Sequence, residues 1–220
     1  MTMLKRCFHI LLHLVVLAAV LPAFAQDEVA FFRAVSVDDD RAVKRWIEAG
    51  GDPNKANPQG QPALTLALRD EAYRVAAVLL AQPALKVDSP NAAGETALML
   101  AALRGQGEWV QRLVAKGAAI NREGWTPLHY AASGGATDVV RWLVEQGAAI
   151  DARSPNRSTP LMMAARYGAS ESVDLLVARG ADTRLRNDRD MNAADFARSA
   201  GRDSMAQQLA ALAAAAPAQR

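Results

Sequence analysis

The 220-residue chain is 51% hydrophobic, 22% charged and 5% aromatic, and its net charge is +2. This apolar content with so little net charge excludes an intrinsically disordered chain. A single cysteine excludes a disulfide-stapled scaffold, because it has no internal partner. The small charge also argues against a nucleic-acid partner, since such proteins carry a strong basic excess.

The first 25 residues are predicted to be a secretory signal peptide. Lys5 and Arg6 precede an apolar run at residues 10–21, and Ala23-Phe24-Ala25 has the small-x-small pattern of a cleavage site. As a helix the run rises only about 18 Å. A membrane anchor needs roughly 30 Å, so we favour cleavage, which predicts a periplasmic or secreted protein without membrane insertion.

Cleavage after Ala25 would change the charge and the reactive side chains of the protein. Lys5, Arg6 and Cys7 would be lost, which leaves 23 basic against 23 acidic residues and no cysteine. His129 would be the only histidine. A cysteine-free chain is indifferent to an oxidising compartment, which suits export.

Two motifs recur in phase along the rest of the chain. Residues 125–132 (WTPLHYAA) have relatives at 158–165 (STPLMMAA), 95–102 (ETALMLAA), 61–68 (QPALTLAL) and 191–197 (MNAADFA). Residues 110–121 (VQRLVAKGAAIN) recur at 140–151 (VRWLVEQGAAID), at 173–182 and, degraded, at 43–54. A period near 33 residues indicates stacked repeats, each of which needs its neighbours to bury its apolar face.

These motifs resemble the ankyrin repeat, and with the predicted signal peptide the chain resembles an exported bacterial ankyrin-repeat protein. The resemblance implies an all-α solenoid of about six helix-turn-helix units with short hairpin loops. We place the repeat domain at residues 26–212, followed by a flexible tail at 213–220. The expected units are about 27–56, 57–89, 90–121, 122–153, 154–186 and 187–212.

Each motif residue has a physical reason to stand where it does. Thr126 and Thr159 occupy positions where a helix N-cap is wanted, and Pro127 and Pro160 follow at the first helical position. Leucine and paired alanines then make a slim helix that can lie against its neighbours. Glycines are predicted to separate the two helices of a unit (Gly135, Gly168) and to end the second helix with a positive φ (Gly147, Gly180).

Two units depart from the pattern. The second unit has Gln61-Pro62-Ala63 where a capping threonine usually stands, so its first helix is predicted to be weakly capped. The junction at residues 122–124 is three residues shorter than the one at 152–157. A notch in the row of loop tips is expected there, although a deletion tolerated in an exposed loop explains the same observation.

The sequence offers no catalytic machinery, cofactor motif or metal-ligand set. It contains no G-x-S-x-G, P-loop or G-x-G-x-x-G pattern. His129 falls on the position of the structural histidine of the family, which the resemblance predicts to brace neighbouring turns. The acidic run at Asp38, Asp39 and Asp40 is better suited to capping a helix than to holding a cation.

The resemblance implies that a partner binds through the loop tips and the exposed side of the first helices. Trp and Tyr among these positions are typical interface anchors, and several arginines suggest an acidic partner. An alternative stays open, in which Trp125 only covers the notch and the arginines are solvated. The candidate partner-binding residues are Trp125, Tyr167, Arg166, Arg104, Arg189, Glu95 and Asn156.

The sequence therefore predicts a non-catalytic, monomeric scaffold that binds another protein in the periplasm or outside the cell. A more specific version is an immunity or inhibitor protein that masks the active site of a toxic enzyme. The alternative of another class is an accessory stabiliser of an envelope or oxidative-stress enzyme.

Overall fold

The computed structural model describes residues 28–215, and the predicted signal peptide and the last five residues lie outside this range. The chain divides into an N-terminal unit that ends at Leu85 and a C-terminal unit that starts at Lys86. Within the described residues the secondary structure is helical, apart from one isolated bridge between Ala56 and Pro62. The fold is an all-α repeat solenoid, as predicted.

The N-terminal unit holds two helical hairpins. Its first helix comprises residues 28–36, which includes Phe31, Phe32 and Ala34 as expected. The others are α2 (Asp40–Glu48), α3 (Ala63–Arg69) and α4 (Tyr73–Leu80). A loop at residues 57–61 precedes α3, where the Asn57 carboxamide oxygen accepts hydrogen bonds from the amides of Gln59 and Gln61.

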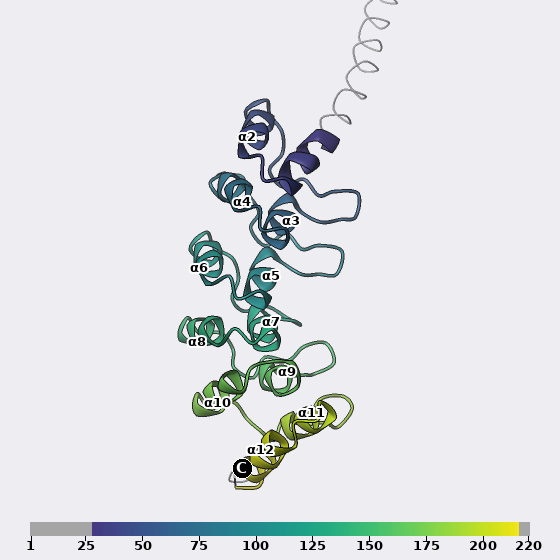
Figure 1. Cartoon of the computed structure of the whole chain (residues 1–220), viewed down its shortest axis with the longest axis vertical. Helices are drawn as coiled ribbons and strands as arrows, with labels where there is room; N and C mark the ends of the chain where they lie inside the picture. Colours follow the sequence, from purple (N-terminus) through teal and green to yellow (C-terminus); the bar gives the residue numbers. More distant parts are fainter. Residues whose placement is uncertain (1–27, 216–220) are drawn as a thin grey trace, which may run out of the picture. The chain divides into compact units, whose positions relative to one another are not determined.

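The C-terminal unit holds four hairpins, each made of an inner helix and an outer helix (Figure 1). The inner helices α5, α7, α9 and α11 pack side by side in that order, and each also packs on its own outer helix. Loops join each outer helix to the next inner helix. The bounds are α5 (Ala97–Leu103), α6 (Gly107–Ala115), α7 (Pro127–Gly134), α8 (Thr137–Glu145), α9 (Pro160–Tyr167), α10 (Ser170–Ala178), α11 (Ala193–Ser199) and α12 (Asp203–Ala215).

The predicted cap at Thr159 is present, since its hydroxyl accepts a hydrogen bond from the Met162 amide at 3.3 Å, and Thr96 bonds to the Met99 amide in the same way at 3.4 Å. At Thr126, the other predicted cap, the hydroxyl contacts the His129 ring instead, 2.9 Å from Nδ1. α3 begins after Pro62 without a side-chain cap, which confirms the weak start predicted for the second unit. Gly147 and Gly180 follow outer helices with φ of +84° and +92°, a conformation that costs glycine little.

The core follows the two motifs. The motif leucines of the inner helices, Leu98, Leu128 and Leu161, are fully buried, as are Leu113, Leu143 and Leu176 of the outer helices. The paired alanines are buried as well, so neighbouring inner helices approach closely. Gly134 shows how closely: a Cβ at this position would lie 1.9 Å from the Leu103 carbonyl oxygen of the preceding inner helix.

Acidic and amide side chains tie successive repeats of the C-terminal unit together. The Asp88 carboxylate accepts a hydrogen bond from the Ala119 amide, Asn121 from that of Ala149, and Asp151 from that of Asp182. The same structural position therefore bonds to the following repeat three times. Burial raises the pKa of the Asp151 carboxyl, an effect that the hydrogen bond from the Asp182 amide partly offsets.

The last hairpin closes the C-terminal unit. Arg202 donates hydrogen bonds to three carbonyl oxygens at the end of α9, those of Ala164, Ala165 and Gly168, at 2.9–3.0 Å. Gln207 and Gln208 on α12 are exposed, as expected for a face without a next repeat. α12 continues to Ala215, so the first three residues of the expected tail are helical, while 216–220 lie outside the described residues.

Candidate functional site

His129 lies on α7, which packs between α5 and α9. Its ring is fully buried, and Nε2 lies 3.0 Å from the Ser158 carbonyl oxygen in the loop before α9. The Thr126 amide and hydroxyl both contact Nδ1, at 3.2 and 2.9 Å. These bonds fit a neutral ring protonated at Nε2. The predicted bracing role of His129 is therefore confirmed.

The environment of His129 keeps the ring uncharged. Burial lowers its pKa from 6.5 to about 4, and the hydrogen bonds to the Ser158 and Ala152 carbonyls oppose this only in part. An imidazole with this pKa is neutral at physiological pH. Because both ring nitrogens are engaged in structural bonds, neither faces a substrate position.

Trp125 stands directly before α7 and is half-buried rather than fully exposed. Its ring meets His129 edge-on at 5.2 Å and Tyr130 edge-on at 6.4 Å, measured between ring centres. The Tyr130 hydroxyl donates to a Glu95 carboxylate oxygen at 3.0 Å, and Asn91 donates to the other oxygen at 2.8 Å. Two predicted partner-binding residues, Trp125 and Glu95, are thus linked through Tyr130.

Burial raises the pKa of the Tyr130 phenol, and the Glu95 carboxylate beside it acts in the same direction. Tyr130 therefore stays protonated and remains a hydrogen-bond donor to Glu95. Sequence reasoning did not single out this tyrosine, although its place next to the motif histidine puts it on the exposed side of α7.

A small hollow opens beside Trp125 on the surface of the inner helices. Its volume is about 170 Å³, which is below the roughly 300–1,000 Å³ typical of ligand pockets. It suits one side chain of a partner protein better than a small-molecule substrate. The lining residues are Leu103, Trp125, His129, Tyr130, Ser133 and Met163.

Tyr167, which is exposed, and Arg166, which is half-buried, form a pair at the end of α9. The Tyr167 side chain is 58% exposed, and the Arg166 guanidinium lies 5.2 Å from the centre of its ring. Arg166 also donates to the Ser199 hydroxyl at 3.3 Å. On α5, Leu103 is 37% exposed and Arg104 follows as an exposed residue. Apolar, aromatic and basic side chains therefore share this surface.

Asn156 and Arg189 lie on two neighbouring loops. The Asn156 side-chain oxygen accepts from the Ser154 hydroxyl at 2.6 Å, and its carbonyl oxygen accepts from the Asp188 amide at 3.1 Å. Asn156 thus shapes its own loop and ties it to the next one. Arg189 is exposed on that second loop, away from the Trp125 cluster.

The loop before α7 is visibly shorter than the loops before α5 and α9 (Figure 1). Arg122 in this loop donates to the Gly94 carbonyl oxygen in the loop before α5, at 3.2 Å. The short loop is therefore joined to its longer neighbour. Trp125 follows this short loop and lines the hollow beside it.

The described part of the chain holds no cluster of three or more histidine, cysteine, aspartate or glutamate side chains placed to bind a metal ion. None of the helices within residues 28–215 is long and apolar enough to cross a bilayer. The acidic run of the N-terminal unit acts in capping, as predicted: Asp39 accepts from the Ala42 amide, and Asp38 from the Val75 amide.

Repeated helical hairpins with slim inner helices define the chain as a helical-repeat protein. The family model for ankyrin repeats (3 copies) matches residues 31–123, 75–154, 108–187 and 140–216, and the chain belongs to this family. A comparison with curated proteins finds no match. Ankyrin repeats commonly mediate binding between proteins, and members of the family are typically non-catalytic scaffolds.

Proposed function

We propose that this protein is an exported, non-catalytic scaffold that binds another protein through the inner-helix surface of its C-terminal unit. The observation that carries the proposal is the group at the ends of α5 and α9, where the exposed Leu103, Arg104 and Tyr167 stand with the half-buried Arg166. Tyrosine and arginine dominate the binding energy of protein interfaces, because they bury a large area at a low entropic cost.

The chemistry of this surface favours a partner with an acidic patch around an apolar side chain. Tyr167 supplies an exposed ring, and the Trp125 hollow has the size of a single side chain. The exposed Arg104 and the neighbouring Arg166 place positive charge beside them, which steers an acidic partner during association. We propose that the scaffold acts as a monomer, because no self-complementary surface is needed for this role.

The interface is tested by exchanging its exposed residues while sparing Trp125, which also packs inside the unit. We expect the double variant Arg166→Ser and Tyr167→Ser to weaken partner binding at least about thirtyfold, which corresponds to about 2 kcal/mol. The matched control is Arg141→Ser, an exposed arginine on the outer helix α8. The partner is captured from the envelope fraction with the wild-type chain, and affinities are then measured by calorimetry.

Equal affinity of the wild type and the double variant, with unchanged melting temperatures, would refute the assigned surface. Export is tested separately by sequencing the N-terminus of the protein from its native host. The expected mature chain begins at Gln26, and a mature protein that retains residues 1–25 would contradict export by a cleaved signal.

A further inference from the structure

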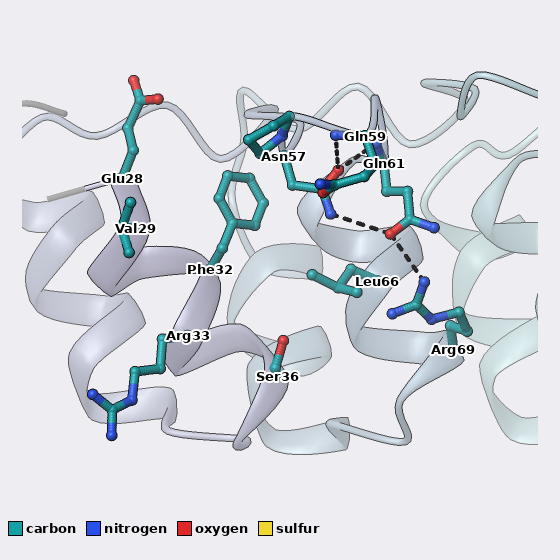
Figure 2. A pocket seen from close by; sticks show the side chains of 11 residues that line it. Glu28, Val29, Phe32, Arg33, Ser36, Asn57, Gln59, Gln61, Leu66 and Arg69 are labelled. Carbon is teal, nitrogen blue, oxygen red and sulfur yellow. Dashed lines mark hydrogen bonds between the residues drawn. The ribbon is translucent and has the colours of Figure 1, made fainter. Parts of the chain in front are cut away.

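The N-terminal unit contains a groove of its own, between the first helix, α3 and the loop at residues 57–61 (Figure 2). Its volume is about 610 Å³, which lies within the roughly 300–1,000 Å³ of ligand-binding sites. All of its lining residues belong to the N-terminal unit. This groove is therefore distinct from the surface proposed above for the C-terminal unit.

The middle of the groove is apolar. Phe32 from the first helix and Leu66 from α3 face it (Figure 2). Pro58 of the loop also lines it. Val29, at the rim, is 73% exposed. An apolar side chain placed there would gain burial against Phe32 and Leu66 and would shield Val29 from water.

A polar wall borders this apolar centre. The Gln61 carboxamide oxygen accepts hydrogen bonds from Asn57, at 3.1 Å, and from Arg69, at 2.9 Å (Figure 2). Arg69 also forms two bonds with the Asp70 carboxylate, at 2.7 and 3.1 Å. The wall is thus held in place by the chain itself, and the groove does not depend on a ligand to keep its shape.

Five of the six positions that line the Trp125 hollow have a counterpart in the groove; Leu103 of the preceding repeat has none, and Arg69 and the loop at residues 57–61 line only the groove. Phe32 stands where His129 stands, Ser36 where Ser133 stands, and Leu66 where Met163 stands, always at the same spacing along the chain. The other two of these five positions differ in chemistry. Trp125 and Tyr130 of the hollow are replaced by Glu28 and Arg33 in the groove.

This exchange contributes to the difference in volume, together with the loop residues and Arg69 that line only the groove. In the C-terminal unit, the Trp125 ring packs edge-on against His129 and Tyr130 and occupies the space. In the N-terminal unit, the Glu28 and Arg33 side chains point away from Phe32 and Leu66 (Figure 2). The chain itself therefore shows that an aromatic ring fits this kind of site, and the groove lacks such a ring of its own.

The charges at the rim of the groove favour a ligand in which an acidic residue stands next to the aromatic one. Glu28 is paired with Lys55, and Asp70 is paired with Arg69. Arg33 is exposed and makes no ion pair with any residue that the structure describes. The uncompensated charge of the groove is thus positive, and a flexible exposed arginine can reach a carboxylate near the rim.

We propose that the groove of the N-terminal unit is a second binding site, which takes a partner polypeptide segment carrying an aromatic residue next to an acidic one. The aromatic ring enters between Phe32 and Leu66 and meets Phe32 edge-on, as Trp125 meets His129. The adjacent carboxylate pairs with Arg33.

The test uses a fluorescein-labelled heptapeptide with blocked ends, in which one phenylalanine is followed by two aspartates among serine and glycine residues. Binding to the full chain, and to the form that begins at Gln26, is measured by fluorescence anisotropy at low ionic strength. We expect saturable binding that Arg33→Glu weakens at least about tenfold, through charge reversal at the rim. The matched control is Arg41→Glu, an exposed arginine on α2 outside the groove, which should change affinity less than about twofold.

A second variant reproduces the C-terminal arrangement. The double substitution Glu28→Trp and Arg33→Tyr should fill the groove and abolish peptide binding without lowering the melting temperature. Arg166→Ser with Tyr167→Ser should leave peptide binding unchanged, because those residues belong to the other unit.

Three results would overturn this inference. The first is no saturable binding to either form of the chain. The second is an equal response to Arg33→Glu and Arg41→Glu, which would indicate non-specific attraction. The third is peptide binding that survives the filled groove or is lost with Arg166→Ser and Tyr167→Ser, which would place the peptide elsewhere.

Discussion

The groove of the N-terminal unit and the Trp125 hollow of the C-terminal unit are built from corresponding positions, yet their volumes are about 610 and 170 Å³. The hollow holds two aromatic residues that the groove lacks, and the groove also extends along the loop at residues 57–61 and Arg69. Where Trp125 and Tyr130 are present, the Trp125 ring packs edge-on against His129 and against Tyr130 and occupies the space. Where Glu28 and Arg33 are present, the charged groups stay in water and leave the apolar centre open.

The two regions also differ in the side chain that occupies the His129 position of the repeat and in the hydrogen bonds that this side chain makes. In the C-terminal unit, His129 bonds to Thr126 and to the Ser158 carbonyl. In the N-terminal unit, this position holds Phe32 in the first hairpin and Thr65 in the second. The buried Thr65 hydroxyl has no hydrogen-bond partner among the described residues. A repeat can therefore keep its fold while its capacity to brace or to bind changes at single positions.

The largest expected effect concerns close packing of inner helices, which should distinguish the two regions most clearly. Gly134→Ala would place a Cβ 1.9 Å from the Leu103 carbonyl oxygen. Relieving this clash would require the backbone of α5 or α7 to shift. We expect a loss of about 3 kcal/mol in the free energy of unfolding, measured by urea denaturation. Val37 holds the corresponding place in the N-terminal unit and is 64% exposed, so Val37→Ala should cost less than about 0.5 kcal/mol. Similar losses for both variants would show that the tight approach is not specific to α5 and α7.

The next effect is the acid sensitivity that His129 confers on the C-terminal unit. Its pKa is lowered by burial from 6.5 to about 4, so the unfolded chain takes up a proton at a higher pH than the folded chain. The contribution of the neutral His129 ring to the free energy of unfolding is therefore complete above about pH 6.5. It is lost as the pH falls towards about 4, with a slope of about 1.4 kcal/mol per pH unit.

This slope is measured by urea denaturation at several pH values between 7 and 4. His129→Gln keeps an amide that can donate to Ser158 but cannot titrate, so its stability should fall less steeply over this range. The carboxylates are common to both proteins and cancel in the comparison. Parallel curves for the two proteins would contradict the assignment of the acid sensitivity to His129.

A smaller expected effect compares Trp125, which fills the hollow, with Glu28, which lies at the rim of the groove. Trp125→Ala removes two edge-on ring contacts and part of the burial of the ring, and should cost about 2 kcal/mol. Glu28→Ala, at the corresponding position, removes only an exposed ion pair with Lys55 and should cost less than about 1 kcal/mol. Thermal unfolding monitored by circular dichroism checks both. If Trp125→Ala has no effect on stability, its ring serves binding alone.

The smallest effect has opposite signs in the two regions. Thr65→Val removes a buried hydroxyl that has no partner among the described residues, and should raise stability by up to about 1 kcal/mol. Thr159→Val removes the hydroxyl that accepts from the Met162 amide, and should lower stability by about 1 kcal/mol. Destabilisation by both substitutions would mean that Thr65 is bonded in solution.

Local rules allowed much of the fold to be predicted from the sequence. The Thr159 cap, the positive φ of Gly147 and Gly180, and the buried leucines of both helices are confirmed. Each depends on a residue and its neighbours within one or two helical turns. The order of the units followed from repetition, because one repeat can pack only on a copy of itself.

The candidate surface was harder to predict, because it depends on contacts between repeats. Glu95 fitted an exposed loop position, but Tyr130 of the next repeat and Asn91 bond to both of its oxygens. Asn156 was expected to face a partner, and it also shapes its loop through Ser154. The groove of the N-terminal unit was not predicted. Charged Glu28 and Arg33 at places where a later repeat has aromatic residues were the pattern that could have revealed it.

The sequence by itself determined the helical hairpins, their number and their slim inner faces, because capping, glycine conformation and apolar periodicity act over a few residues. Only the tertiary structure decided which apolar positions are filled by rings of the chain and which stay open, since that depends on side chains a full repeat apart. The open groove beside Phe32 and the filled hollow beside His129 are the two cases in this chain.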